Sequence, residues 1–326
     1  MTDPIDEKPV VDVEYQKPLP VERRQRRPAD AIRLPGWDEL PDRARPYLSL
    51  SRIDRPVGIW LLALPCWIGL AFARIPDGLQ WIDLWWAILF GVGSVAMRGA
   101  GCTWNDITDK DLDAGVARTA GRPLPAGEIG MRQAYVWLVI QLAVGFLVWL
   151  CLPGAAKLVS LAALPLVIAY PFMKRITWWP QAWLGLTFNW GVLVAAATVG
   201  VFGFATLVLY ASLALWTIAY DTIYALEDQE DDALVGVRST ARLFGDRAIT
   251  AAFGFHLAAT THMAFATYLF GAGRIGAITA LAFLGHGVWQ STRLKSSRNS
   301  DALLVFKSNV WAGLIILIGC VLMASL

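Results

Sequence analysis

The chain has 326 residues, 56% of them hydrophobic and only 17% charged, and its mean hydropathy of +0.49 excludes an ordinary soluble globular protein. A formal net charge of +2 gives no overall basic field of the kind that attracts nucleic acid. The four cysteines stand singly, without the spacing of a zinc site or a disulfide framework, so the composition favours an integral membrane protein.

Residues 1–47 differ in character from the rest of the chain. They are rich in proline and charge and contain no sustained apolar run, so we expect a poorly ordered tail and not a signal peptide. Residues 48–326 are expected to form one membrane domain.

Nine apolar stretches of roughly 17 to 25 residues follow, each long enough to cross a bilayer as a helix. Many of the 16 tryptophans lie near the ends of these stretches, as is typical of residues at a membrane interface. The expected fold is therefore all-α, with nine transmembrane helices. Their ranges are 56–73, 81–102, 132–152, 155–173, 182–201, 203–226, 247–270, 274–290 and 306–325.

Lysine and arginine are divided unequally between the connections. The connections after the first, third, fifth and seventh stretches carry only Arg74, Lys157 and Arg274. By the positive-inside rule the other connections and the N-terminus are cytoplasmic, and the C-terminus lies on the far side. Those other connections hold Lys110, Arg118, Arg122, Arg132, Lys174, Arg175, Arg238, Arg242, Arg247, Arg293, Lys295, Arg298 and Lys307.

An acidic cluster directly follows the second apolar stretch. If the helix continues, Asn105, Asp109 and Asp113 stand at i, i+4 and i+8 of one face, and Asp106 is adjacent. Hard oxygen donors at this density suit Mg²⁺, which also binds phosphate. An acidic motif of this kind is equally typical of a solvated cytoplasmic loop.

A second acidic cluster ends the sixth stretch, in a connection that faces the same compartment. Asp221, Asp228 and Asp232 stand at i, i+7 and i+11 and share a face if the helix persists. Asp221 is close to the membrane boundary, where an ionisable side chain indicates function. Two acidic clusters on one side of the membrane indicate a shared site.

Arginines follow both clusters closely. Arg118 and Arg122 come after the first, and Arg238 and Arg242 after the second. Guanidinium groups bind phosphate oxygens in a bidentate manner, so metal-binding acids beside arginines favour a diphosphate ligand. The positive-inside rule explains the same arginines without any ligand, and that alternative stays open.

At these residues the chain resembles the UbiA superfamily of intramembrane prenyltransferases, over residues 48 to 326. Within it, the chain looks most like the hydroxybenzoate branch of bacterial ubiquinone synthesis. The motifs that carry the resemblance are RIDRPVG at 52–58, NDxxDxxxD at 105–113, RTxxRPL at 118–124, YPFMKR at 170–175 and YDTxYAxxDxxDD at 220–232, followed by Gly236 and Ser239.

The resemblance implies nine helices around a central cavity, with the acidic motifs at its cytoplasmic end and a lateral opening for a lipid tail. It implies that Arg118 and Arg122, with Arg52, assist in binding the diphosphate. Lys174 and Arg175 match a basic site for a diphosphate or for the carboxylate of the acceptor. The implied Mg²⁺ ligands are Asn105, Asp106, Asp109, Asp113, Asp228 and Asp232.

The implied activity is Mg²⁺-dependent transfer of a polyprenyl group from its diphosphate to 4-hydroxybenzoate, ortho to the hydroxyl, in a bacterial inner membrane. Metal and guanidinium promote loss of diphosphate, and the phenol ring attacks the resulting allylic cation. Asp221 is expected near the acceptor, or else to be a structural partner of an arginine.

Two other readings compete with this one. A transporter or channel also has many spans and boundary acids, but it predicts acids near mid-span. A UbiA relative could instead prenylate haem, chlorophyllide, a naphthoate or a glycerol phosphate.

The histidines at 256, 262 and 286 lack the spacing of a metal site and are assigned no function.

Overall fold

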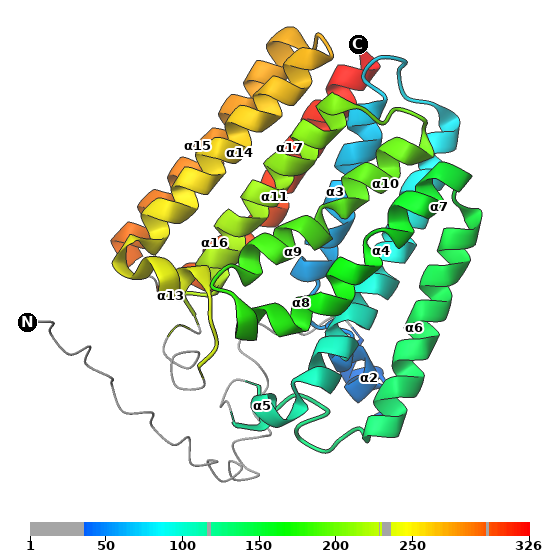
Figure 1. Ribbon diagram of the computed structural model, residues 1–326, viewed down its shortest axis with the longest axis vertical. Helices are drawn as coiled ribbons and strands as arrows, with labels where there is room; N and C mark the ends of the chain where they lie inside the picture. Colours follow the sequence, from blue (N-terminus) through cyan, green and yellow to red (C-terminus); the bar gives the residue numbers. More distant parts are fainter. Residues whose placement is uncertain (1–35, 116–118, 228, 230–235, 298–299) are drawn as a thin grey trace, which may run out of the picture.

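The computed structural model describes residues 36–115, 119–227, 229, 236–297 and 300–326. Within these ranges every regular element is a helix (Figure 1). A short 3-10 helix, η1 (Trp37–Glu39), and α2 (Arg45–Leu50) precede the first long helix, and both begin within the predicted tail. Residues 1–35 of the predicted tail lie outside the described part.

Each predicted apolar stretch coincides with one helix or with two consecutive helices. The single helices are α3 (Val57–Ala73), α4 (Trp81–Thr108), α6 (Met131–Cys151), α11 (Phe204–Tyr224), α14 (Ala248–Leu269) and α15 (Gly273–Ser297). The pairs are α7 (Gly154–Leu161) with α8 (Leu164–Ile176), α9 (Pro180–Phe188) with α10 (Trp190–Thr198), and α16 (Ala302–Lys307) with α17 (Asn309–Ser325).

Five helical segments of the described chain are long and apolar enough to cross a membrane. They are Trp81–Thr108, Met131–Cys151, Gly154–Ile176, Phe204–Tyr224 and Ala302–Ser325. Helix α3 is apolar but shorter. The structure thus supports a multi-pass helical membrane protein.

Two of the broken helices are interrupted at asparagines. The Asn189 amide, between α9 and α10, donates to the Gly185 carbonyl at 2.8 Å and to the Thr217 hydroxyl at 2.7 Å. Asn309, at the start of α17, accepts from the Trp216 indole at 2.9 Å. Buried amides of this kind satisfy the polar groups that a break leaves free inside an apolar bundle.

Small residues allow helices to approach closely at the centre of the bundle. A Cβ atom at Gly69 of α3 would lie 2.7 Å from the Cα atom of Val192 in α10. A Cβ atom at Gly185 of α9 would lie 2.7 Å from the carbonyl oxygen of Ala214 in α11. Packing of this kind replaces the hydrophobic effect as the cohesive force between helices in lipid.

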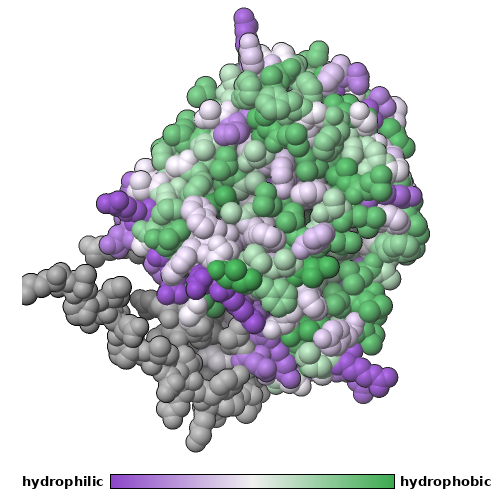
Figure 2. Space-filling view, viewed as in Figure 1, coloured by the Kyte–Doolittle hydropathy of each residue, from purple (hydrophilic) through white to green (hydrophobic). Residues whose placement is uncertain are grey.

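The outer surface is largely apolar. Figure 2 shows hydrophobic residues over most of one face, with hydrophilic residues towards its edges. Helix α6 exposes Val139, Phe146 and Leu147. An apolar outer face is suited to contact with lipid chains.

Candidate active site

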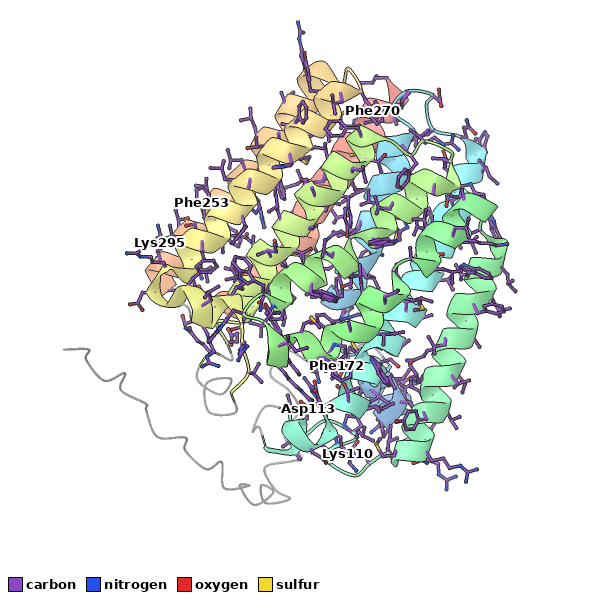
Figure 3. All side chains as sticks on the ribbon, viewed as in Figure 1. Lys110, Asp113, Phe172, Phe253, Phe270 and Lys295 are labelled. Atoms are coloured by element: carbon purple, nitrogen blue, oxygen red, sulfur yellow. The ribbon has the colours of Figure 1, made fainter. Side chains whose placement is uncertain are left out.

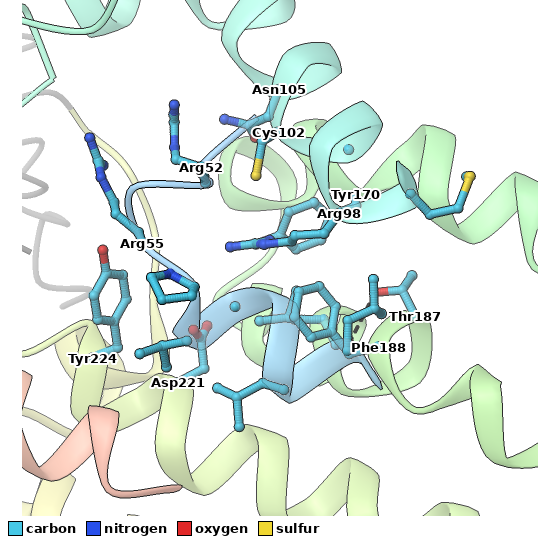
Figure 4. A pocket seen from close by; sticks show the side chains of 18 of the residues that line it. Arg52, Arg55, Arg98, Cys102, Asn105, Tyr170, Thr187, Phe188, Asp221 and Tyr224 are labelled. Atoms are coloured by element: carbon cyan, nitrogen blue, oxygen red, sulfur yellow. Dashed lines mark hydrogen bonds between the residues drawn. The ribbon is translucent and has the colours of Figure 1, made fainter. Parts of the chain in front are cut away.

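A cavity of about 420 Å³ opens at the end of the bundle where the acidic residues lie. Its wall comes from the segment before α3 and from α3, α4, α8, α9, α11 and α16 (Figure 4). Arg52, Asn105, Asp106 and Arg122 line one end of it. The cavity thus joins a charged end to a membrane-embedded interior.

Arg52 and Asp106 form the central ion pair of the charged end. One guanidinium nitrogen of Arg52 lies 2.6 and 2.9 Å from the two carboxylate oxygens of Asp106, and both side chains are buried. Another nitrogen of Arg52 donates to the Ser49 carbonyl at 3.1 Å. Arg52 has φ = 58°, and it is the only non-glycine residue in the described ranges with a positive φ. The chain thus accepts an unfavourable backbone conformation where it places this charge.

Arg122 joins Asp106 to the last acid of the first cluster. It donates to Asp106 at 3.2 Å and to Asp113, in the short helix α5 (Lys110–Gly115), at 2.6 Å. The Thr119 hydroxyl donates a hydrogen bond to the backbone carbonyl of Asp113 at 2.9 Å. Burial raises the pKa of Asp113 and the Asp106 carboxylate raises it further, although Arg122 opposes both effects.

Asp109 faces a different set of cations. Its carboxylate accepts from Lys174, and from Arg175 at 2.7 Å, both near the C-terminus of α8. Figure 3 shows Asp113 of α5 at the same end of the molecule as Phe172 of α8. The basic pair and the first acidic cluster, 65 residues apart in the chain, therefore form one ionic group.

The predicted continuous helical faces are not found. Helix α4 ends at Thr108, and Asp109 at its C-cap separates it from α5. The Asp109 carboxylate accepts from Arg175 of α8, while Arg122 donates to both Asp106 and Asp113. Helix α11, which carries Asp221, ends at Tyr224 and does not continue through residues 225–227.

Three predicted site residues, Arg118, Asp228 and Asp232, lie outside the described residues. Asp221 lies in the cavity wall. Beyond the second cluster, the backbone N–H of Arg238 donates to the Lys174 carbonyl at 3.0 Å, and the Arg238 guanidinium donates to the Ile176 carbonyl at 2.7 Å. The chain that follows the second cluster thus returns to the end of α8 that binds Asp109.

Arg98 was not among the predicted site residues, and it lies in the cavity wall within α4. Figure 4 shows its side chain extending into the pocket, with Asp221 on another part of the wall. Its guanidinium lies 5.2 Å from the centre of the Phe188 ring, and its buried Nε atom has no hydrogen-bond partner among the described residues. Gly58 makes room for it, because a Cβ atom there would lie 2.6 Å from the guanidinium. The available signal was an arginine within an apolar stretch.

The remaining wall of the cavity is mainly apolar and aromatic. It includes Leu61, Leu62, Val167, Leu184 and Phe306. Phe306 packs against Tyr224, with ring centres 4.5 Å apart and ring planes tilted by 40°. Such a lining suits an aromatic ring and an isoprenoid chain, and it excludes water from the interior.

The donor chemistry of the charged end fits Mg²⁺. Asn105 and Asp106 present hard oxygen atoms beside the cavity, as Mg²⁺ requires. Within the described ranges, no three histidine, cysteine or acidic side chains gather closely enough to hold a metal on their own. In the described residues the charges of the first cluster are balanced by Arg52, Arg122 and Lys174.

Comparison with known proteins decides the family. The profile of the UbiA prenyltransferase family matches residues 62–313. The chain belongs to this family. Solved structures agree with this fold: a UbiA homolog from Aeropyrum pernix K1 is 27% identical with a TM-score of 0.68, covering 81% of this chain and 97% of the homolog. A UbiA homolog from Archaeoglobus fulgidus bound to GPP and Mg²⁺ has a TM-score of 0.65 at 18% identity, over 86% and 100% of the two chains.

Several curated relatives carry the name 4-hydroxybenzoate polyprenyltransferase, mitochondrial. The Bos taurus protein is 42% identical over 94% of this chain and 82% of its own length. The Homo sapiens protein is 40% identical over 87% and 77%. The Aedes aegypti protein is 45% identical over 85% of this chain, which spans only 63% of that relative.

Proposed function

We propose that this UbiA family member is a 4-hydroxybenzoate polyprenyltransferase of ubiquinone biosynthesis. It transfers a polyprenyl group from polyprenyl diphosphate to the carbon ortho to the phenol hydroxyl, and diphosphate leaves. The observation that carries the proposal is a cavity that has paired acids and cations at one end and, further in, an arginine beside Phe188 with a buried Nε atom that has no partner among the described residues. The names of the relatives support the same substrates.

The diphosphate binds at the charged end. Arg52 and Arg122 line the cavity there. Lys174 and Arg175 form ion pairs with Asp109 of the same ionic group. Arg118 completes this set in our proposal. The four described cations each form an ion pair with a carboxylate and can exchange it for a phosphate oxygen, an equally strong charge-assisted acceptor.

Mg²⁺ would be held by the two acidic clusters. Its ligands in this proposal are Asn105, Asp106, Asp109, Asp113, Asp228 and Asp232. When bound, Mg²⁺ neutralises charge on the departing diphosphate and so favours cleavage of the allylic C–O bond.

The 4-hydroxybenzoate lies deeper, with its carboxylate on Arg98. A buried guanidinium N–H without a partner costs free energy until a ligand supplies an acceptor, and a carboxylate supplies a charged one. Phe188 lies under the guanidinium and offers an apolar surface to the ring. Asp221, on the opposite wall, accepts the proton released when the substituted ring regains aromaticity.

The apolar wall serves the isoprenoid. It excludes water, which would otherwise capture the allylic cation in place of the phenol ring. The tail then extends towards the lipid along apolar residues of α3 and α16, including Leu61 and Phe306.

We also propose nine membrane spans, formed by residues 48–326, and a cytoplasmic tail formed by residues 1–47. The support is the coincidence of all nine apolar stretches with a helix or a helix pair. A bacterial inner membrane follows only from the family resemblance of the sequence motifs, and the distribution of lysine and arginine favours the N-terminus and the charged end on the cytoplasmic side.

The decisive experiment uses the purified chain in lipid nanodiscs. Incubated with a polyprenyl diphosphate, 4-hydroxybenzoate and Mg²⁺, it is expected to yield the C-prenylated acid, identified by mass spectrometry. Excess chelator should abolish the product, and added Mg²⁺ should restore it. Undiminished product in chelator would overturn the metal-dependent mechanism, and ion transport without prenylation would favour a transporter.

Arg98→Gln is expected to lower kcat/KM for 4-hydroxybenzoate about 100-fold, because the carboxylate loses its only proposed cationic partner in a desolvated site. The uncharged analogue 4-hydroxybenzamide serves as the control substrate. Its kcat/KM should be nearly the same in wild type and variant, since no charge pair is lost. An equal loss for both substrates would mean that Arg98 supports the shape of the cavity and does not bind the carboxylate.

A further inference from the structure

Trp104 has an unusual indole N–H group. Its Nε1 atom is buried and has no hydrogen-bond partner among the described residues, and the side chain lines the cavity. Six other indole N–H groups donate to protein acceptors at 2.7 to 3.2 Å. These belong to Trp67, Trp137, Trp149, Trp183, Trp190 and Trp216. No other indole in the described ranges is both buried and unpartnered.

A buried donor without a partner calls for an acceptor that the protein itself does not supply. An indole N–H can only donate, so that acceptor must carry a lone pair, and an anionic oxygen binds it most strongly. Because Trp104 lines the substrate cavity, a bound substrate is the candidate that could supply this acceptor.

The position of Trp104 along α4 distinguishes the two substrates. Consecutive helical residues rise about 1.5 Å, so Trp104 lies at the level of Asn105 and Asp106 and about 9 Å from the level of Arg98. Asp106 carries the ion pairs with Arg52 and Arg122 at the charged end. The backbone of Trp104 therefore lies at the level where the diphosphate binds, about one and two-thirds helical turns from the proposed carboxylate site.

We propose that the Trp104 indole N–H donates a hydrogen bond to an oxygen of the prenyl diphosphate. This inference rests on the proposed function and adds a substrate-binding residue from outside the acidic and basic motifs. Trp104 binds the leaving group through a neutral donor, which needs no counter-charge when the cavity is empty.

The test compares wild type with Trp104→Phe, which keeps an aromatic ring and removes the N–H. The probe is inorganic pyrophosphate with Mg²⁺, measured as a competitive inhibitor of prenylation. We expect its Ki, and the KM for the prenyl diphosphate, to rise about tenfold. The KM for 4-hydroxybenzoate should not change.

Trp149→Phe is the matched control, because its indole donates to the Lys157 carbonyl at 3.2 Å, away from the cavity. This control should lower the melting temperature and leave Ki unchanged. Trp104→Phe should leave the melting temperature of the substrate-free protein unchanged, since no hydrogen bond is lost there.

A second variant, Trp104→Leu, separates the N–H from the ring and serves if the phenylalanine variant does not fold. A raised Ki in the folded variants supports the proposal. Normal Ki in Trp104→Phe overturns it, whether or not Trp104→Leu is weakened, and so does an effect confined to 4-hydroxybenzoate. A wild-type protein that neither prenylates nor binds pyrophosphate would instead overturn the proposed function.

Discussion

Asp221→Asn is expected to lower kcat for prenylation by a factor of about 10² to 10⁴, the usual contribution of a positioned acid or base. The amide keeps the shape of the side chain and removes its ability to accept a proton. Both KM values should stay close to those of wild type, because Asp221 acts after the substrates have bound. Steady-state kinetics with each substrate varied in turn measures the effect.

The control for this variant is Asp246→Asn, in the short 3-10 helix η2 (Gly245–Arg247) outside the cavity wall. It should have wild-type kinetics. If Asp221 is instead a structural partner of an arginine, its asparagine variant should melt at a lower temperature and lose kcat only in proportion to the folded fraction. That result would exclude a role in proton transfer.

Asp106→Ala is expected to destabilise the protein by about 3 to 5 kcal/mol and to abolish prenylation. The reason is that the buried guanidinium of Arg52 loses its counter-ion, which costs more than the pair itself contributes. Arg122 retains Asp113, so it is less affected. Thermal unfolding in detergent, followed by circular dichroism, measures the loss.

The double variant Arg52→Met with Asp106→Leu tests the cause of that loss. Removing both charges should recover much of the stability, since no unpaired buried charge remains. Activity should not return, because the diphosphate site has lost a cation and a metal ligand. A double variant as unstable as Asp106→Ala alone would mean that packing, and not charge, dominates at this position.

The helices of this protein were largely predictable, because a long apolar stretch in lipid has few alternatives to a helix. The positions at which these helices are interrupted were harder to predict. None of them was predicted, although a polar residue within an apolar stretch, Asn189 or Asn309, lies at two of them. The end of α4 at Thr108 was not predicted, because the continuous spacing of the acids suggested an unbroken helix.

The composition of the candidate site was also predictable in part. The motifs identified Arg52, Asp106 and Arg122, but their pairing depends on tertiary contacts between residues up to 54 positions apart. Arg98 and Trp104 belong to no predicted acidic or basic cluster. They become candidates only when burial reveals donors without acceptors, a property that a sequence does not contain.

The left-handed backbone at Arg52 has a consequence for protein engineering. Glycine or asparagine fits such a φ better than arginine does, so selection for stability alone would tend to replace this residue. Selection for turnover would restore it, because only a long cationic side chain reaches Asp106 from here. Arg52 should therefore be kept when the protein is engineered for higher thermal stability.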